Sequence, residues 1–256
     1  KAWNLTPQMT AAPGLWRNAE LVLPLWEGFG HSLLANPNTP LTPSLKAGVL
    51  LNNADWSKQS QGTSVYVSGQ QSASSSDRIS IPVDSSVIFG STPTTFFIHC
   101  RKSWSSDLNP IISCGNPNDG SLRFAISDDN RSGGNFTFTL HNNGNWVPPK
   151  WTTANLKTNE PETIALTWDG FSKLELFISG KFYGQPDADT GISASDFPQT
   201  NKNLIIGAGQ QSSRSDEYWG FQGHIYFVAI HSRVLSASEI YHLSSDPFAM
   251  LRPAGI

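Results

Sequence analysis

Carboxylate side chains are the first residues in this sequence that could carry out catalysis. Retaining hydrolysis of a glycosidic bond needs two carboxyl groups about 5–5.5 Å apart, and residues two apart on a strand share a face. Among the glutamates, Glu160 and Glu162 have this spacing. Pro161 lies between them, and the pair falls where a loop enters a strand. We therefore expect a solvated turn here and no catalytic pair.

The other residue types used in catalysis show no matching motif. The six histidines form no H-E-x-x-H pattern, and no serine occupies a G-x-S-x-G elbow. His224 and His231 share one predicted strand at an odd spacing, which points them to opposite faces of a regular strand. Residues 207–209 (Gly-Ala-Gly) have no helix after them and predict a turn at a strand end. We therefore expect a protein that is not an enzyme.

Loops rich in oxygen ligands offer a second kind of chemistry, the binding of calcium. Ca²⁺ takes several oxygen ligands from carboxylates, amides and loop carbonyls. The segments "SDDNRSGGN" (127–135) and "QPDADTG" (185–191) gather such oxygens between predicted strands. No EF-hand spacing is present, and polar turns held by local hydrogen bonds are the alternative explanation. The candidate calcium ligands are Asp128, Asp129, Asp187 and Asp189.

Tryptophans beside amides offer a third chemistry, the binding of sugars. Aromatic faces stack on the apolar faces of sugars, while amides and carboxylates bond the hydroxyls. The best candidate is "HNNGNWVPPKW" (141–151), a Gly/Pro-containing loop, followed by "DEYWGF" (216–221). Trp26 and Trp168 lie on strands and predict core positions instead. The candidate carbohydrate-binding residues are Trp146, Trp151, Asn143, Asn145 and Trp219.

Composition and charge argue against two kinds of partner. The net charge is −3 with no run of Lys or Arg, so a surface that follows the phosphates of nucleic acid is not expected. No stretch of about 18 apolar residues is present, so we expect no membrane span. Abundant Gly, Pro and aromatic residues, with only 14% charged residues, favour many short strands over helices.

Short strands separated by turn residues recur along the chain from residue 20. The predicted strands are 20–26, 48–53, 63–69, 77–83, 94–104, 109–115, 121–127, 135–142, 162–170, 173–184, 202–209 and 220–233. This rhythm is typical of an all-β, two-sheet antiparallel β-sandwich or jelly roll. Residues 1–19 show no clear period and are predicted to form an N-terminal arm, followed by one domain over 20–256.

The two cysteines fall in one predicted hairpin. Strands 94–104 and 109–115 are expected to pair through a turn at 105–109, which places Cys100 and Cys114 on neighbouring strands. A disulfide and two buried thiols are both compatible with this placement.

One short helix is expected near the C-terminus. Ser236 is its N-cap, and Glu239 three residues later completes a capping box. Ile240 and Leu243 supply an apolar face, and Asp246 followed by proline ends the helix.

Three segments resemble a known family. The segment "ELVLPLWEGFG" (20–30) is similar to the opening strand of laminin-G-like domains in the concanavalin-A-like lectin/glucanase superfamily. The segment "TIALTWDGFSKLELFISGKFYG" (163–184) resembles the central signature of that family, two strands joined by a tight D-G turn. The closing signature, an I-G strand, a G-x-I strand and an R-x-L-S-x-x-E-I helix, resembles residues 204–209 and 219–247.

This resemblance covers most of residues 20–247 and implies two antiparallel sheets packed face to face. Members of the family are mostly binding modules for carbohydrate or protein, often on cell or virion surfaces, and some use calcium. The superfamily also contains glucanases, whose catalytic strand carries E-x-D-x-E, a pattern that this sequence lacks. The tail "DPFAMLRP" (246–253) resembles the ends of laminin-G-like proteins from bacteriophages and uncultured viral genomes.

Three functions follow as hypotheses. The favoured one is a non-catalytic, lectin-like module that binds a carbohydrate or cell-surface polymer outside the cell or on a virion. The second is a structural virion protein that contacts other virion proteins through residues 1–19, where Trp3 and Trp16 have no evident place in a sandwich. The third is a polysaccharide hydrolase or lyase on the same fold.

Overall fold

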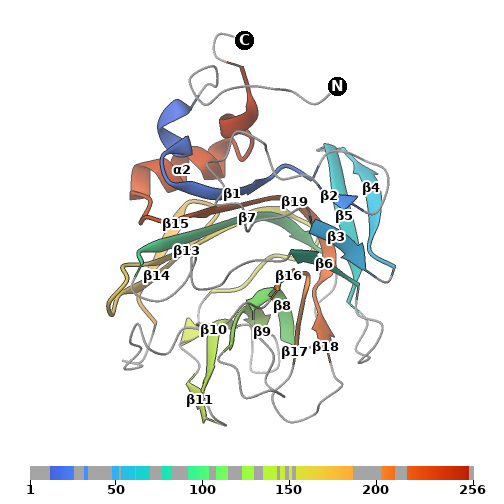
Figure 1. The fold of residues 1–256 in the computed structure, drawn as a ribbon, viewed down its shortest axis with the longest axis horizontal. Coiled ribbons are helices and arrows are strands. Elements are labelled where there is room, and N and C mark those ends of the chain that lie inside the picture. Colours follow the sequence, from blue (N-terminus) through green and yellow to red (C-terminus); the bar gives the residue numbers. More distant parts are fainter. Residues whose placement is uncertain are drawn as a thin grey trace.

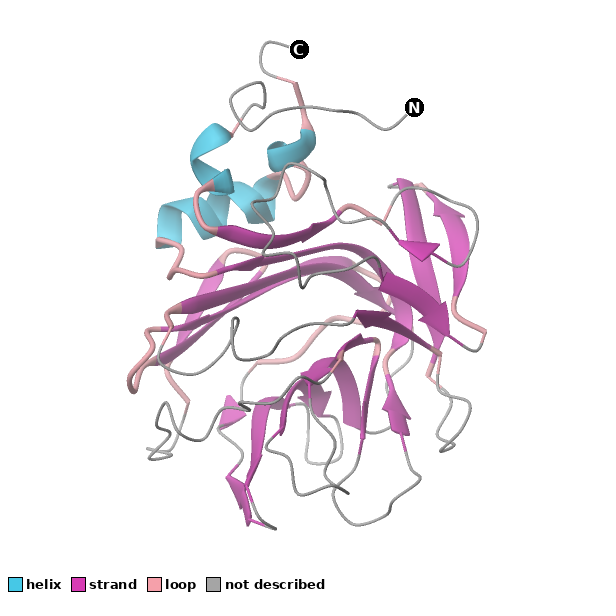
Figure 2. Cartoon of the chain, in the orientation of Figure 1, coloured by secondary structure: helices cyan, strands magenta, loops and turns pink. Residues whose placement is uncertain are grey.

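The structure of the protein is a computed structural model, and its described residues form two antiparallel sheets and one α-helix (Figures 1 and 2). The described residues are 12–25, 32–33, 48–51, 53–60, 62–69, 77–81, 92–103, 108–114, 123–129, 135–142, 145–147, 150–151, 154–186, 203–210 and 218–253. The predicted sandwich with one short helix is confirmed. No helix in these ranges is long and apolar enough to cross a membrane.

The first sheet has eight strands in the described part of the chain. Their hydrogen-bonded order is β15 (Lys181–Gly184), β14 (Leu174–Ile178), β13 (Pro161–Trp168), β7 (Thr94–Lys102), β19 (Gln222–His231), β5 (Gly62–Ser68) and β4 (Asp55–Gln59). The eighth strand, β1 (Ala19–Leu23), pairs with the C-terminal half of β19.

The second sheet has nine strands in the described part of the chain. Their order is β11 (Asn145–Val147), β10 (Asn135–Asn142), β9 (Arg123–Asp129), β8 (Leu108–Cys114), β16 (Leu204–Ile206), β6 (Arg78–Ile81), β3 (Gly48–Leu51) and β2 (Ser32–Leu33). The ninth strand, β12 (Lys150–Trp151), pairs with β10. A small ribbon joins β17 (Ala208–Gln210) to β18 (Tyr218–Gly220).

The predicted hairpin of β7 and β8 is wrong, because the two strands lie in different sheets. Strand β7 pairs with β13 and β19, whereas β8 pairs with β9 and β16. Almost every residue of β7 is buried, so the strand belongs at the centre of a covered sheet, between strands far away in sequence. Cys100 and Cys114 form no disulfide and are both buried in the core between the sheets.

Two apolar layers follow from the alternation of side chains along the strands. Phe96, Ile98 and Cys100 of β7 face the nine-stranded sheet, where Phe96 lies against Phe124 at 5.4 Å between ring centroids. Phe97 faces the other way, into a second cluster beneath the helix. The eight-stranded sheet is therefore apolar on its inner face and on part of its outer face.

The helix α2 (Ala237–Ser245) covers this part of the outer face (Figure 1). Its predicted capping box is confirmed, because Ser236 accepts from the N–H of Glu239 and Glu239 accepts from the N–H of Ser236. The predicted apolar face is confirmed as well, since Ile240 and Leu243 are fully buried. Two short 3₁₀ helices, η2 (Pro13–Trp16) and η5 (Ala249–Leu251), complete the layer.

The described part of the predicted N-terminal arm, residues 12–19, packs on this layer. Leu15 and Trp16 are buried, and the indole N–H of Trp16 donates to the carbonyl of Met250 at 2.8 Å. Trp16 therefore has a defined place on the sandwich, contrary to the expectation from sequence. Residues 1–11, including Trp3, lie outside the described residues.

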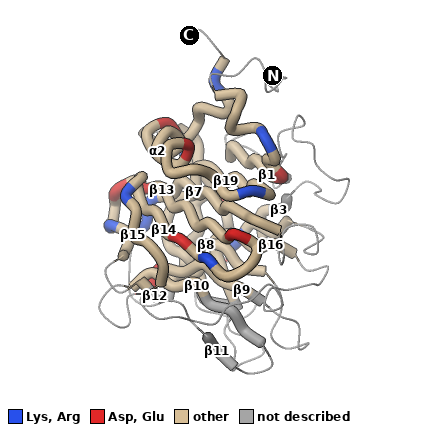
Figure 3. Tube along the Cα trace, turned by 90° about the vertical axis from the view of Figure 1, so that its left-hand side faces the viewer, with Lys and Arg blue, Asp and Glu red and all other residues tan. Residues whose placement is uncertain are grey.

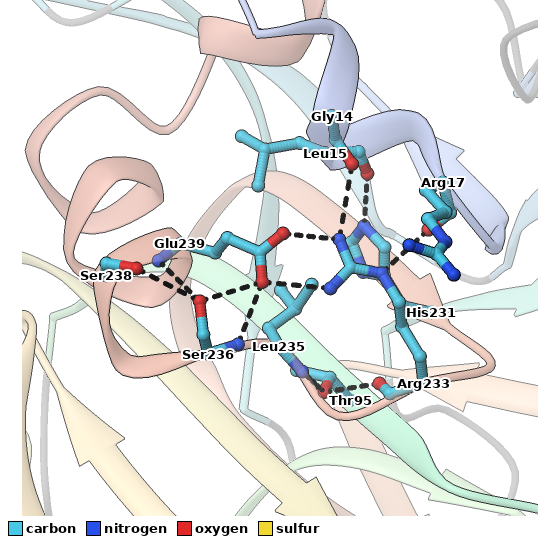
Figure 4. A network of polar contacts seen from close by, with 10 residues as sticks. All are labelled: Gly14, Leu15, Arg17, Thr95, His231, Arg233, Leu235, Ser236, Ser238 and Glu239. Atoms are coloured by element: carbon cyan, nitrogen blue, oxygen red, sulfur yellow. Dashed lines mark hydrogen bonds and ion pairs between the residues drawn. The ribbon is translucent and has the colours of Figure 1, made fainter.

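A polar network joins this segment to the C-terminal part of the domain (Figure 4). The guanidinium of Arg233 bonds both carboxylate oxygens of Glu239, at 2.9 and 2.7 Å, and also the carbonyls of Gly14 and Arg17. The side-chain bond from Arg233 holds the pKa of Glu239 down at about 2. His231 donates from Nε2 to the carbonyl of Leu15 at 2.8 Å.

A bulge in β19 overturns the prediction that His224 and His231 point to opposite faces. The pairing with β7 shifts register between Ile225 and Phe227, so Tyr226 is an additional residue in the strand. This one-residue insertion compensates for the odd spacing. Both histidines consequently lie on the outer face, His224 beside Tyr66 and His231 beneath Leu15.

A buried ion pair connects the two sheets. Lys102 at the end of β7 contacts Asp128 of β9 at 2.7 Å, with side-chain exposures of 2% and 0%. The second carboxylate oxygen of Asp128 accepts the N–H of Leu156 at 3.1 Å. The carbonyl of Lys102 accepts the N–H of Asn159 at 2.6 Å. The pair thus also fixes the segment that leads into β13.

The ion pair predicts a large stability loss for Lys102→Met. This change leaves the carboxylate of Asp128 buried without its counter-charge, and we expect the free energy of unfolding to fall by about 3 kcal/mol. The double variant Lys102→Met/Asp128→Asn should recover part of the loss, because Asn keeps an acceptor for Leu156. Urea unfolding of the three proteins measures the difference. An unchanged midpoint for Lys102→Met would contradict this role.

The buried imidazole of His231 predicts acid sensitivity. Burial lowers the pKa of His231 from 6.5 to about 4. Between these values the unfolded chain binds the proton and the folded chain does not, so stability falls as the pH drops from 6.5 to 4. The difference in the pKa of His231 between the two states lowers the free energy of unfolding by about 3 kcal/mol as the pH falls from 6.5 to 4.

The variant His231→Gln isolates this effect. Glutamine keeps an N–H donor for Leu15 but cannot take up a proton, so its unfolding free energy should depend less on pH. Urea unfolding at pH 7, 5.5 and 4.5 compares the variant with the parent protein. Parallel pH profiles for the two proteins would argue against His231 as the titrating group.

Candidate functional site

The structure assigns Trp151 to the core, which corrects its predicted role in sugar binding. Its side chain is 1% exposed, packs edge-to-face on Phe136 and donates from Nε1 to the carbonyl of Gly184 at 3.0 Å. Its neighbourhood was expected to be a loop, but residues 150–151 form a short strand against β10. The bulky indole therefore fills the inner layer and offers no face to a ligand.

For three of the other predicted sugar-binding residues the structure describes only the backbone, and the fourth lies outside the described residues. Asn145 and Trp146 lie on β11, where Trp146 is the cross-strand partner of His141, and Trp219 lies on β18. The side chains of these residues, and all of Asn143, lie outside the described residues.

The predicted calcium ligands Asp128 and Asp129 lie on strand β9 and are buried, whereas a loop was expected. The carboxylate of Asp128 already accepts from Lys102 and Leu156. Asp187 and Asp189 lie outside the described residues. Among the residues that are described, no three His, Cys, Asp or Glu side chains are grouped so that they could hold a metal.

The two glutamates with catalytic spacing have unlike surroundings. Glu160 is exposed and pairs with Lys157 at 2.8 Å. Glu162 is buried and accepts from the N–H of Lys157 at 2.6 Å and from the hydroxyl of Ser179 at 3.4 Å. Burial raises the pKa of Glu162, while the bond from Lys157 opposes that rise. The two carboxylates each have a structural partner.

A group of polar and aromatic side chains on the outer face of the eight-stranded sheet, beyond the helical layer, is the candidate site, although the sequence did not single it out. We call it the outer-face cluster. Its members are Ser64 and Tyr66 of β5, His99 and Arg101 of β7, and His224 and Tyr226 of β19.

Strand register brings the members of the cluster together. Arg101 and Tyr66 are both cross-strand partners of His224, so the three residues form one row across the sheet. Tyr226 is the bulged residue of β19 and lies toward the next row, near His99. Each of the three strands contributes two residues at a spacing of two, which puts both on one face.

Close contacts make the cluster a continuous surface. Ring centroids lie 5.0 Å apart for Tyr66 and His224, and 4.9 Å apart for His99 and Tyr226. The hydroxyl of Ser64 is 3.1 Å from Nδ1 of His224. The guanidinium of Arg101 donates to the side-chain carbonyl of Gln59 at 2.9 Å. Tyr66 and Arg101 are partly exposed, whereas the other four members of the cluster are buried.

The imidazoles of the cluster are uncharged at neutral pH. Burial, with a further contribution from the charge of Arg101, lowers the pKa of His224 to about 4. Burial likewise lowers the pKa of His99, whose Nδ1 bonds the carbonyl of Glu162. Burial raises the pKa of the Tyr226 phenol, so it keeps its proton. The cluster therefore combines a guanidinium with neutral hydrogen-bonding rings.

Packing at the margin separates the cluster from the helical layer. His99 meets Phe248 at 6.1 Å between ring centroids, and Phe248 also meets Phe227.

Elsewhere in the described chain, basic and acidic residues are interspersed (Figure 3). Neither sheet carries a continuous basic tract in the described residues of that view.

Strand order, the two apolar layers and the C-terminal helix define a lectin-like β-sandwich. The family model of the concanavalin A-like lectin/glucanases superfamily matches residues 94–241, more than half of the chain. The chain belongs to this superfamily. No curated protein matches it by sequence.

Solved structures share the fold at low sequence identity. Domain 4 of AbnA, an extracellular GH43 arabinanase from Geobacillus stearothermophilus, in complex with arabinotriose, has a TM-score of 0.63 at 13% identity, covering 89% of this chain and 98% of that one. The binding domain of Paraclostridial Mosquitocidal Protein 1 has a TM-score of 0.62 at 11% identity, covering 90% of this chain and 52% of that one. Trypanosoma rangeli sialidase in complex with 2,3-difluorosialic acid has a TM-score of 0.59 at 13% identity, covering 91% and 34%. These similarities show the fold alone.

The assignment of Trp151 to the core predicts that its loss harms folding. We expect Trp151→Ala to lower the free energy of unfolding by about 3–5 kcal/mol, because it removes a buried ring and leaves a cavity. Trp151→Phe should cost less, since it keeps most of the apolar volume. Chemical unfolding of both variants tests the assignment. Full stability of the alanine variant would mean that the indole is not in the core.

Proposed function

We propose that this protein is a non-catalytic carbohydrate-binding module whose ligand contacts the outer-face cluster. The observation that carries the proposal is the combination in one cluster of a partly exposed aromatic ring, Tyr66, with the polar groups of His224 and Arg101. Membership of the superfamily and the similar fold of a domain solved with arabinotriose support it.

The chemistry of the cluster suits a sugar better than an apolar or a nucleic-acid ligand. A tyrosine ring can stack on the apolar face of a pyranose or furanose. Neutral imidazoles can both donate to and accept from hydroxyl groups. The neighbouring guanidinium adds several N–H donors that do not depend on pH.

Two predictions from the sequence remain part of the proposal as additional features. Trp146 and Asn145 of β11, Asn143, and Trp219 of β18 would supply additional contacts to sugars. Calcium bound at Asp187 and Asp189 would be a structural or ligand-bridging ion. Neither feature is needed for binding at the outer-face cluster.

We propose binding without hydrolysis because the two glutamates with suitable spacing are engaged elsewhere. Glu162 is held by Lys157 and Ser179 inside the domain, and Glu160 pairs with Lys157 at the surface. A module of this kind would act outside the cell or on a virion, where residues 1–11 could provide the attachment to other proteins.

The proposal predicts that Tyr66→Ala weakens glycan binding about tenfold, corresponding to the loss of one stacking contact of about 1.4 kcal/mol. A glycan array, with and without calcium, identifies a ligand of the parent protein. Titration calorimetry with that glycan then measures the variant. Tyr241→Ala is the matched control, because Tyr241 is an exposed tyrosine on α2.

Three results would count against the proposal. The first is an array without any bound glycan under both conditions. The second is equal affinity of Tyr66→Ala and the parent protein, which would move the binding surface away from this cluster. The third is release of reducing ends from polysaccharides, which would show hydrolysis.

A further inference from the structure

We infer that the outer-face cluster recognises a carboxylate, and that the ligand is therefore an acidic sugar. This inference rests on the proposed function and specifies the ligand class for the same site. Two buried atoms without any hydrogen-bond partner, Nε of Arg101 and the hydroxyl oxygen of Tyr226, carry it.

Both atoms belong to groups that normally have partners in a folded protein. A buried polar atom that makes no hydrogen bond costs about 1–3 kcal/mol. The guanidinium of Arg101 uses one of its terminal nitrogens for Gln59, and Nε is left with an unused N–H. Tyr226 is fully buried, and its hydroxyl likewise has an unused proton. The cluster thus contains two unused donors just below its partly exposed side chains, Tyr66 and Arg101.

A carboxylate is the chemical group that suits two such donors best. An ionised carboxylate only accepts hydrogen bonds, and it can accept from two donors at once. A guanidinium is the side chain best suited to such a group, because its N–H bonds lie in one plane. The positive charge of Arg101 would repel a cation. A neutral hydroxyl group would be attracted to that charge less strongly than a carboxylate is.

The electrostatic field in the cluster agrees with this assignment. The charge of Arg101 contributes to the lowered pKa of His224 and opposes the raised pKa of Tyr226, so its field reaches both rings. Since both imidazoles are neutral at pH 7, they do not compete with Arg101 for the anion. They can instead bond the hydroxyl groups next to the carboxylate.

Tyr66 extends the site from an anion to a sugar acid. Its ring lies 5.0 Å from His224, in the same row as Arg101, and is partly exposed. A sugar ring stacked on Tyr66 could direct an attached carboxylate toward Arg101. Uronic acids and sialic acids have this combination of a ring and a carboxylate.

The experiment compares acidic sugars with their uncharged esters. The probes are methyl glucuronide, methyl galacturonide and N-acetylneuraminic acid, each beside its carboxyl methyl ester, titrated into the full chain by calorimetry or NMR. We expect at least one acid to bind more than tenfold tighter than its ester. Arg101→Gln should remove this difference, whereas Arg252→Gln, at an exposed arginine, should leave it unchanged.

The variant Tyr226→Phe separates binding from folding. Because the hydroxyl has no partner in the protein, removing it should leave the unfolding midpoint unchanged or raised. The affinity for the acidic sugar should nevertheless fall severalfold. A lower midpoint with unchanged affinity would indicate that the hydroxyl serves the fold, and would overturn its role in recognition.

The remaining outcomes separate this inference from the proposed function. If neutral glycans bind and depend on Tyr66, while acids bind no better than their esters, the carboxylate site is wrong and the sugar-binding function stands. If no sugar of either kind binds, on the array or in titration, both fail. If acids bind but Arg101→Gln has no effect, the carboxylate is recognised elsewhere.

Discussion

The buried ion pair between Lys102 and Asp128 is the constraint on which the arrangement of the two sheets depends. It joins the last residue of β7 to the next-to-last residue of β9, and the same two residues hold the segment before β13 through Leu156 and Asn159. A buried charge without a counter-charge would destabilise the sandwich. The two sheets can therefore pack only in the relative position that brings Lys102 and Asp128 together. Arg101, next to Lys102, then necessarily faces outward. One dipeptide therefore connects the inner core with the outer-face cluster.

The close approach of β7 and β19 sets the spacing within that cluster. A Cβ added to Gly223 would lie 2.2 Å from the carbonyl oxygen of Arg101, so no larger residue fits here without moving one of the strands. Tyr226 shares a face with His224 because the two are two residues apart, and the bulge at Tyr226 then brings Phe227 to that same face. The glycine fixes the distance between the strands, and the bulge adds a side chain to the outer face. Together they explain why this part of the sheet carries a dense polar cluster.

The strands and the helix could be predicted from sequence, because each depends on residues that are close together in the chain. The candidate site could not be predicted, because it depends on which distant strands lie side by side. The alternation of Ile79 and Ile81, and the Ser236–Glu239 capping box, each depend on neighbouring residues and are present in the structure. Strand β7 pairs with β13 and β19, which lie at least 60 and 121 residues further along the chain, whereas β8 follows it directly, so a hairpin with β8 is the natural but wrong expectation. Trp151 was assigned to a ligand because its flanking residues are polar, while its surroundings in space are apolar. In the sequence, the two cluster residues of each strand are two positions apart, which places them on one face. Only the order of the strands in the sheet shows that the three pairs lie side by side.

The outer face of the eight-stranded sheet is divided between an apolar part under the helical layer and a polar part beyond it. Along β19, Phe227 and Ala229 lie under the helical layer, whereas His224 and Tyr226 come before it. The boundary falls at His99, which contacts both Tyr226 and Phe248. A helix that covered the polar part as well would bury Arg101, and no acidic residue of α2 is placed to compensate it, since Glu239 already pairs with Arg233. The position of the charge therefore limits how far the apolar layer can extend, and the part of the sheet beyond that limit carries polar and aromatic side chains, of which Tyr66 and Arg101 are partly exposed.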